Sequence, residues 1–493
     1  METIKLNPSG LSFLRDVDSR LISYNIEMTE VTGGTFWKPY TPEQVAGTEE
    51  FPRISDLSQL ASLMGMFPPA DFYEERARKL AKALGPVYVR VSGSWATNTY
   101  YDFDGSTNGQ PPKGFRSVLT RDQWNGVLDF VKYVGAELMI SVANCDGVQT
   151  EDGRWDPAQA RLLFDYSRDY GVPVAAAEFM NEPNTAALGG SPSNYSIEAF
   201  CRDQDAFYRF VRENYPEVKI VGPCASGDNF SKHVAYGQMA FWPSEDLLKG
   251  CQESPDVFSY HMYHGLSERG AAMGTHWNPD QATSEEYLGV SQEAAEYYGA
   301  LRDKYYPGTQ MWVTESADAG LGGDTWASTF LDVIRSADEL GRFCTVTDGI
   351  IFHNTLMASD YAYLDHETHL PRPNYWLALL WNTLVGTKVY DSGEKIREDF
   401  HCYAHSRRDG KEGFVYVMIN TSRTENTRVE LSCSGQRYTL SAENIRSGQI
   451  LLNGKPLEIR GTAGLPPFEG EDVTASAIEL APATVTFFVT GEK

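Results

Sequence analysis

The sequence reads ELMISVAN at 137–144, DPAQARLLFDYSRDY at 156–170 and AAAEFMN at 175–181. Two short, continuously apolar runs flank a segment whose apolar residues recur at intervals of three and four. Continuous apolar runs are typical of parallel strands that are covered on both faces. The period of three to four is that of an amphipathic helix. This stretch therefore predicts a strand–helix–strand unit.

The same unit recurs along most of the chain. Eight apolar runs alternate with helix-sized segments: LISYNIEM (21–28), VYVRVSG (87–93), ELMISVAN (137–144), AAAEFMN (175–181), KIVGPCA (219–225), VFSYHMY (257–263), MWVTES (311–316) and GIIFHNTL (349–356). This pattern predicts an α/β fold with a (β/α)8 TIM barrel over residues 19–388. A doubly wound open sheet is the main alternative, but no glycine-rich phosphate loop follows the first strand.

The pattern changes after residue 389. Short alternating runs such as FHCYAHSR (400–407), GFVYVMINTS (413–422) and ATVTFFVT (483–490) are separated by turn residues. Such alternation is typical of an antiparallel sandwich. We expect a smaller β-sandwich domain over residues 389–493. Residues 1–18 would complete it, with TIKLN (3–7) pairing into the sandwich as an N-terminal strand.

Composition excludes several classes of partner. The 493 residues contain 67 Asp and Glu against 42 Lys and Arg, a formal net charge of −25. Such a chain repels polyanions, so nucleic acid is not expected as a partner, and a highly sulfated polysaccharide is disfavoured as a substrate. No apolar run approaches the roughly 18 residues that cross a bilayer. The N-terminus METIKLNPSGLSF has no signal-peptide pattern, so the sequence as written predicts a cytoplasmic protein, or a secreted or periplasmic one if a leader was removed.

Two glutamates follow predicted strands at the rim where barrel enzymes carry their reactive residues. Glu182 lies in FMNEPN (179–184) and Glu315 in TES (314–316). A single Glu at such a place more often caps a helix or pairs with an Arg. However, Pro183 ends the strand after Glu182, and the flanking Asn side chains offer amides to sugar hydroxyls. A pair of acids on one rim is what glycoside hydrolysis requires.

These motifs also carry a family resemblance. Asn181-Glu182-Pro183 together with Glu315 resembles the clan A retaining glycosidases. Further stretches narrow the resemblance to glycoside hydrolase family 79, the family of β-glucuronidases and heparanase. They are LGPVYVRVSGS (84–94), GLGGDTW (320–326) and RPNYWLALLWNTLVGTKV (372–389), with QILLNGKPLEI (449–459) and ATVTFFVT in the sandwich.

The resemblance implies roles for four residues. Glu182 would be the general acid/base and Glu315 the nucleophile of a double displacement with retention at the anomeric carbon. Glu182 is expected to stay protonated near neutral pH, with the ionised Glu315 raising its pKa. Asn181 would hold the 2-hydroxyl of the sugar, and Tyr263 would hydrogen-bond Glu315.

The resemblance also implies how a uronic acid is recognised. Its C6 carboxylate would be received by backbone N–H groups of Gly322 and Gly323 and by the hydroxyl of Tyr361. Neutral donors suit an anion in such a site. Glu27 would face the outer hydroxyls of the sugar, and if it binds the 4-hydroxyl, a 4-O-methyl group should be poorly tolerated.

Two features depart from the family pattern. Asp360 stands beside Tyr361, and its negative charge would disfavour a uronate unless the side chain points away. The segment TGGTFWKPYTPEQV (32–45) has no match in the family. Its Trp37 and Tyr40 either wall the non-reducing end of the site or pack the loop.

No metal site or cofactor is predicted. His366-Glu367-Thr368-His369 has its histidines three apart, whereas a metalloprotease needs them four apart on a helix. His261 and His264 should lie on opposite faces of a strand and so cannot share a metal.

The sequence therefore predicts a retaining exo-β-D-glucuronidase that acts on small glycosides or oligosaccharides; it does not set the oligomeric state. The alternative is an endo-β-glucuronidase that cleaves within heparan-type chains. A carbohydrate-binding protein without catalysis is a third possibility, against which the presence of both Glu182 and Glu315 speaks.

Overall fold

Eight parallel strands close into a barrel in the computed structural model, which describes residues 4–185, 189–236 and 241–491. In chain order the strands are β3 (Ile22–Glu27), β6 (Tyr88–Ser92), β9 (Glu137–Ser141), β10 (Val174–Glu178), β11 (Lys219–Ala225), β12 (Val257–Tyr263), β13 (Gln310–Ala317) and β14 (Ile351–His353). Each overlaps one of the predicted apolar runs. The predicted TIM barrel is therefore confirmed.

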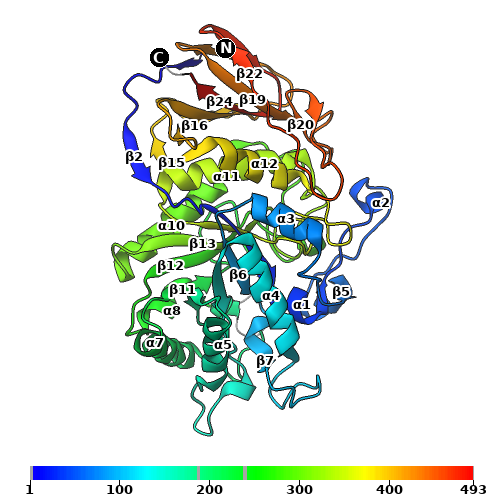
Figure 1. Ribbon diagram of the computed structural model, residues 1–493, viewed down its shortest axis with the longest axis vertical. Helices are drawn as coiled ribbons and strands as arrows, with labels where there is room; N and C mark the ends of the chain where they lie inside the picture. The colour runs from blue at the N-terminus through cyan, green and yellow to red at the C-terminus, as the bar shows by residue number, and fades with distance from the viewer. Residues whose placement is uncertain (1–3, 186–188, 237–240, 492–493) are drawn as a thin grey trace.

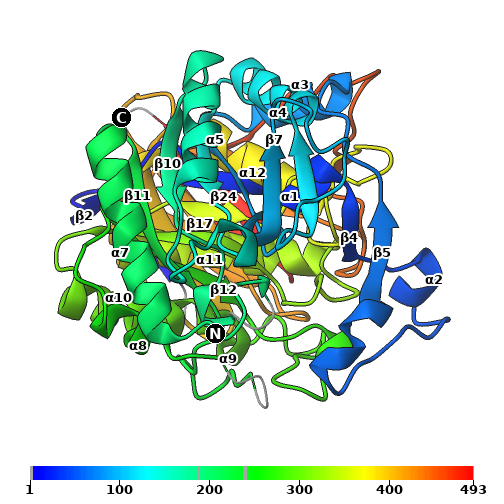
Figure 2. The ribbon, with the colours of Figure 1, turned by 90° about the horizontal axis from the view of Figure 1, so that it is seen from below.

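Helices cover the outside of the barrel (Figures 1 and 2). The main ones are α3 (Glu75–Ala83), α4 (Arg121–Val134), α5 (Ala158–Asp169), α7 (Ile197–Asn214), α8 (Ser244–Lys249), α10 (Val290–Tyr305), α11 (Phe330–Val346) and α12 (Pro373–Leu384). In α4, Thr120 and Gln123 form a capping box at the start, and Gly135 ends the helix with a left-handed φ of 77°. None of the described helices combines the length and apolar character needed to span a bilayer.

Short helices and strands lie in the loops of the barrel. They are α1 (Met28–Thr32), α2 (Pro42–Val45), α9 (Glu285–Leu288), the hairpin strands β4 (Gly34–Trp37) and β5 (Met64–Phe67), and the parallel pair β7 (Thr99–Asp102) and β8 (Ser117–Thr120). The hairpin and α1 are inserted between the first two barrel strands. They occupy one side of the barrel in Figure 2.

A second part, made of two sheets, lies above the barrel in Figure 1. The larger sheet contains β2 (Phe13–Asp16), β15 (Val385–Tyr390), β16 (Phe400–Arg407), β17 (Phe414–Asn420), β24 (Thr484–Thr490), β19 (Gly435–Ser441), β20 (Leu451–Leu452), β21 (Lys455–Pro456) and β22 (Glu471–Val473). The smaller sheet contains β1 (Ile4–Leu6), β18 (Thr427–Leu431) and β23 (Ala477–Leu480). These sheets form the second, smaller β-domain that was predicted.

The N-terminal segment reaches both sheets. β1 runs parallel to β18, and β2 runs antiparallel to β15. β15 begins at Val385, inside the range assigned to the barrel from sequence. The domain boundaries otherwise stay a prediction, and residues 1–3, 186–188, 237–240 and 492–493 of those ranges lie outside the described residues.

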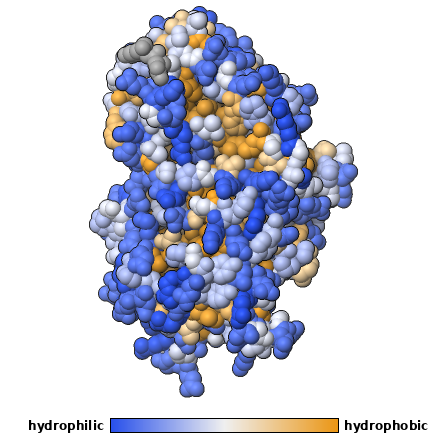
Figure 3. All heavy atoms as spheres, viewed as in Figure 1, coloured by the Kyte–Doolittle hydropathy of each residue, from blue (hydrophilic) through white to orange (hydrophobic). Residues whose placement is uncertain are grey.

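Apolar side chains fill the space between the two sheets, among them Phe400, Tyr416, Val429, Ile478 and Phe488. On the face shown in Figure 3 most of the surface is hydrophilic, with larger apolar areas in the upper half.

Helix α11 joins the barrel to the larger sheet and packs on β16 and β17. Its buried Asp338 accepts hydrogen bonds from Nδ1 of His401, at 2.5 Å, and from the Tyr403 hydroxyl, at 2.6 Å. Nε2 of His401 lies 3.2 Å from Glu285. Burial lowers the pKa of His401, but the charge of Asp338 and these hydrogen bonds outweigh it and raise the pKa to about 9. A protonated histidine thus ties the sheet to the barrel.

This linkage predicts a pH-dependent stability. A raised folded-state pKa contributes stability below the unfolded value of about 6.5 and loses it as pH rises through about 9. We expect the wild type to lose about 3 kcal/mol of unfolding free energy between pH 6.5 and 9.5 that His401→Gln does not lose. Denaturant titrations at both pH values would measure this, with His366→Gln on a surface turn as the control. Equal pH slopes for wild type and His401→Gln would contradict it.

Candidate active site

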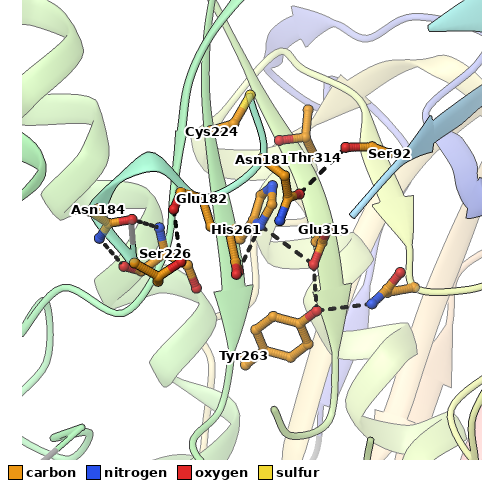
Figure 4. A network of polar contacts seen from close by, with 12 residues as sticks. Ser92, Asn181, Glu182, Asn184, Cys224, Ser226, His261, Tyr263, Thr314 and Glu315 are labelled. Carbon is orange, nitrogen blue, oxygen red and sulfur yellow. Dashed lines mark hydrogen bonds and ion pairs between the residues drawn. The ribbon is translucent and has the colours of Figure 1, made fainter. Parts of the chain in front are cut away.

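Side chains from several strands meet at the carboxyl ends of the barrel and line a cavity of about 570 Å³. Glu182 follows β10, Tyr263 ends β12 and Glu315 lies in β13 (Figure 4). Asn181, Glu27 and Tyr361 also line the cavity. Six of the eight residues predicted for the site therefore line one cavity.

The two glutamates face each other across His261. Nδ1 of His261 lies 3.1 Å from Oε1 of Glu182 and 3.4 Å from Oε2 of Glu315 (Figure 4). One oxygen of each carboxylate and the ring nitrogen all lie within 4.8 Å of one another. Retaining glycosidases have carboxyl groups about 5 to 5.5 Å apart, and inverting enzymes about 6.5 to 9.5 Å. An oxygen–oxygen separation within 4.8 Å is compatible with the retaining spacing and is shorter than the inverting one.

Arg90 is hydrogen-bonded to three side chains of the site. Its guanidinium bonds both oxygens of Glu178, at 2.6 and 3.1 Å, and Oε1 of Glu315, at 3.0 Å. It also donates to Oδ1 of Asn181 at 2.8 Å, which leaves the amide nitrogen of Asn181 for the cavity. All these side chains are buried. A buried charge persists only when paired, so Arg90 fixes the orientation of three acceptors at once.

The guanidinium of Arg90 determines which ring nitrogen of His261 carries the proton. One of its nitrogens, Nη2, lies 3.4 Å from Nε2 of His261. Arginine only donates, so Nε2 is the acceptor and the ring proton sits on Nδ1. The Nδ1–H therefore points at the two glutamates.

Sequence reasoning missed both Arg90 and His261 as site residues. It considered His261 only as a metal ligand together with His264. In the structure His264 lies away from the site, and its Nε2 is 3.2 Å from the Ser291 hydroxyl. A signal for Arg90 was present: an arginine in the middle of VYVRVSG, a strand expected to be buried on both faces, must find an acidic partner.

The direction of the Glu182 pKa differs from the expectation. Burial raises the pKa of Glu182, but the hydrogen bonds from His261 and Ser226 and the positive charge of Arg90 outweigh burial, and the pKa lies below its ordinary value. The expectation that the pKa of Glu182 is raised, so that it stays protonated near neutral pH, was therefore wrong for the free protein. The physical reason is that His261 stands between the two carboxylates.

Tyr263 makes the contact that the resemblance predicted. Its hydroxyl donates to Oε2 of Glu315 at 2.7 Å and accepts from the Asn354 amide at 3.0 Å (Figure 4). Burial raises the pKa of Tyr263 well above its usual range, so the phenol remains a donor. The Asn354 amide also lies 3.4 Å from the Tyr361 hydroxyl. Asn354 thus links the nucleophile candidate to the predicted carboxylate subsite.

The predicted glycine loop lies behind the cavity wall. Leu321 lines the cavity, whereas Gly322 and Gly323 are buried and do not. The three residues have φ of 65°, 90° and 84°, and a Cβ on Gly322 would lie 2.8 Å from the Trp37 side chain. Within the described ranges, neither glycine N–H has a hydrogen-bond acceptor. Successive free N–H groups of this kind suit an anion.

Asp360 points away from the cavity. Both of its oxygens accept from the Tyr40 N–H at 3.2 Å, and Oδ2 lies 3.6 Å from the guanidinium of Arg269. Tyr40 is buried under Arg269, 3.7 Å from the ring centroid, and packs the loop. Trp37 lines the cavity instead. Tyr40 therefore packs the loop, whereas Trp37 lines the cavity; that Trp37 faces the non-reducing end of the sugar stays a prediction.

One cluster in the described part of the chain offers three groups to a metal, and it consists of Glu182, His261 and Glu315. Arg90 lies 3.0 Å from Glu315, and its positive charge opposes a cation at this place. The His261 Nδ1–H and the Tyr263 hydroxyl already point at the carboxylate oxygens. The donor set fits acid/base chemistry between two carboxylates better than a metal.

Several known proteins resemble this chain in sequence. The chain is 23% identical to heparanase-like protein 1 of Arabidopsis thaliana, over 83% of each chain. It is 24% identical to the hyaluronoglucuronidase of Hirudo nipponia, over 90% of this chain and 95% of that one. It is 23% identical to the baicalin-beta-D-glucuronidase of Scutellaria baicalensis, over 75% and 72%. No family model matches the chain.

Solved structures show the same fold at low identity. A 4-O-alpha-L-rhamnosyl-beta-D-glucuronidase from Fusarium oxysporum superposes with a TM-score of 0.67 and 11% identity, over 99% of this chain and 100% of that one. A GH51 arabinofuranosidase from Xanthomonas axonopodis pv. citri gives 0.63 and 15%, over 99% of both. The protein is thus a glycoside hydrolase with a TIM barrel and a β-domain. Its sequence relatives confirm the predicted resemblance to glycoside hydrolase family 79, the family of the heparanases and β-glucuronidases.

Proposed function

We propose that the protein is a retaining exo-β-D-glucuronidase that removes terminal β-linked glucuronic acid from glycosides or oligosaccharides. The observation that carries this proposal is the placing of Glu182 and Glu315, with oxygens within 4.8 Å, on one cavity wall. Relatives that are named β-glucuronidases support the same substrate class.

The reaction has two steps, in which Glu315 is the nucleophile and Glu182 is first the acid and then the base. In the first, Oε2 or Oε1 of Glu315 attacks the anomeric carbon while Glu182 gives its proton to the departing oxygen. In the second, Glu182 takes a proton from water, whose oxygen attacks the anomeric carbon and releases Glu315. Two inversions give net retention. Arg90 and Tyr263 hold Glu315 by hydrogen bonds of 3.0 and 2.7 Å.

The sugar is recognised by neutral donors. The C6 carboxylate binds the Tyr361 hydroxyl and the N–H groups of Gly322 and Gly323, which lack protein acceptors in the described ranges. Leu321 lines the cavity and the two glycines do not, so the carboxylate reaches their N–H groups only if Leu321 moves. Asp360 does not oppose the carboxylate, because its charge faces Arg269. Asn181 holds the 2-hydroxyl with its free amide nitrogen.

The cavity favours exo action on an uncharged aglycone. Among its described lining residues, Arg116 is the only Lys or Arg. A sulfated chain that continued past the site would need several cations along its path. Endo cleavage is the second candidate, since several relatives are named heparanases.

Release of nitrophenol from p-nitrophenyl β-D-glucuronide tests the proposal, with the β-glucoside and the β-galacturonide as controls. Fast release from the glucuronide alone is the expected result. No release from any of the three, with folded protein, would overturn exo action. Heparan and hyaluronan fragments would then test the endo alternative.

The value of kcat/KM should be highest at acid pH. The first step needs protonated Glu182, so kcat/KM falls as pH rises through the pKa of that group, which lies below its ordinary value. With phenyl β-D-glucuronide, whose leaving group needs the proton, we expect the falling limb to lie in the acid range. His261→Ala removes the donor from Glu182, and the limb should move to higher pH. A profile that is flat up to pH 8, or one that does not move in His261→Ala, would contradict this.

A further inference from the structure

Two cysteine side chains meet on the outside of the barrel, where α7 and α8 lie side by side (Figures 1 and 2). Cys201 lies in α7, and Cys251 comes directly after Gly250, the C-cap of α8. The two sulfurs lie 3.3 and 3.0 Å from the same oxygen, the carbonyl of Leu247. The thiols also form a hydrogen bond with each other. They are therefore in contact, both as free thiols.

Other contacts hold the segment of Cys251 against α7. Both oxygens of Asp205 accept from the Gln252 N–H, at 3.0 and 2.9 Å. The side-chain amide of Gln204 donates to the Cys251 sulfur at 3.1 Å. Positions three and four residues apart are neighbours on a helix, so Gln204 and Asp205 share the face of α7 that carries Cys201. The closeness of the two sulfurs thus does not depend on the thiol–thiol hydrogen bond alone.

Gly250 lets this segment approach Cys201 closely. A Cβ at Gly250 would lie 2.8 Å from the sulfur of Cys201 and 3.3 Å from its Cβ, so a larger residue would collide with the cysteine. The Cβ atoms of a disulfide are about 3.5 to 4.5 Å apart. The backbone beside Cys251 therefore approaches Cys201 about as closely as the two halves of a disulfide approach each other.

The two thiols differ in reactivity. The hydrogen bond from the Cys251 thiol lowers the pKa of Cys201, and it outweighs burial and the nearby charges of Asp205 and Glu198. The thiolate is the reactive form of cysteine, so Cys201 is the nucleophile of the pair. It is only 3% exposed, and the two carboxylates repel anions. A small, neutral oxidant suits this place better than a large or negatively charged one.

We propose that Cys201 and Cys251 form a site of reversible oxidation by hydrogen peroxide. The Cys201 thiolate attacks one oxygen of the peroxide and breaks its O–O bond, which leaves a sulfenic acid on Cys201 and releases hydroxide. The Cys251 sulfur then attacks the sulfur of the sulfenic acid. The S–S bond forms, and the departing hydroxyl takes the thiol proton and leaves as water. The two thiols lose two electrons, which the peroxide gains.

The disulfide should stabilise the protein. It closes a ring that contains β11 and three residues that line the catalytic cavity, Ser226, Tyr236 and Phe241. A cross-link over a long loop restricts the unfolded chain, and the stabilisation grows with loop length in the chain-entropy model. We expect the oxidised protein to have a Tm higher by about 3 °C or more.

Peptide mapping after treatment with hydrogen peroxide tests the proposal. The native protein is oxidised, its remaining thiols are blocked, and it is digested without reduction for mass spectrometry. We expect one disulfide, between Cys201 and Cys251, which dithiothreitol reverses together with the rise in Tm. Cys251→Ser should keep the sulfenic acid on Cys201, where dimedone traps it, and should show no rise. Cys433→Ser, at the other half-buried cysteine, is the matched control and should behave as the wild type.

Three results would overturn the proposal. The first is a peroxide-treated wild type whose map shows both peptides but no disulfide between them; this map decides even if a variant folds poorly. The second is a disulfide that forms without raising Tm. The third is dimedone labelling of Cys201 in Cys251→Ser that does not exceed labelling of the other cysteines. No readout uses a glycoside, so this outcome and that of the proposed function are independent.

Discussion

Glu315→Gln is expected to lower kcat/KM for p-nitrophenyl β-D-glucuronide by at least about 10⁴-fold, as the loss of a nucleophile does in other covalent enzymes. Glutamine has the same shape, so its oxygen can still accept from Arg90, which lies 3.0 Å from Glu315 Oε1, while its amide nitrogen takes the place of Oε2 beside the Tyr263 hydroxyl. What is lost is the charge that forms the bond to the anomeric carbon.

Binding separates a lost nucleophile from a damaged fold. Calorimetric titration with the uncleaved nitrophenyl glucuronide should give a dissociation constant within about tenfold of the wild-type KM, a change of about 1.4 kcal/mol or less. Glu137→Gln is the control, because Glu137 starts β9 at the opposite rim of the barrel. Turnover of Glu315→Gln within tenfold of the wild type would contradict the mechanism.

The barrel could be predicted because its strands are covered on both faces. LISYNIEM and ELMISVAN are mainly apolar, and the structure has β3 and β9 there. The hairpin could not be predicted in the same way. β4 and β5 come from GTFW and MGMF, too short and too far apart in sequence for either period to appear. Their pairing depends on tertiary contacts, such as the ring of Phe36 against Trp95.

The positions of Glu182 and Glu315 were predictable because strand ends of a barrel share one rim. Their electrostatics were not. The pKa of Glu182 depends on His261, which comes from a different strand, β12, and reaches the space between the two glutamates. Likewise the orientation of Asp360 depends on Arg269, far away in sequence. Spacing along the chain identifies which residues reach a site. The direction of a pKa shift, or the way a side chain points, depends on neighbours from other strands and loops.

Glu182→Gly is expected to separate the two chemical steps. The backbone at Glu182 has a left-handed φ of 43°, which glycine adopts without strain. Phenyl β-D-glucuronide needs a proton on its leaving oxygen, so kcat/KM should fall by about 10² to 10⁴-fold. The nitrophenyl substrate needs less help in the first step. Its glycosyl-enzyme should accumulate, seen as a rapid burst of nitrophenol, because no base activates water for the second step.

Azide should restore turnover of the nitrophenyl substrate by Glu182→Gly, since this anion attacks without a base and the glycine leaves room for it beside His261. The product should be the β-glucuronosyl azide, because attack on a glycosyl-enzyme inverts a centre that Glu315 has already inverted once. NMR of the product decides the configuration, and Glu137→Gln should give neither a burst nor an azide effect. An α-configured azide would mean direct displacement and would contradict the retaining assignment drawn from the spacing of the two carboxylates.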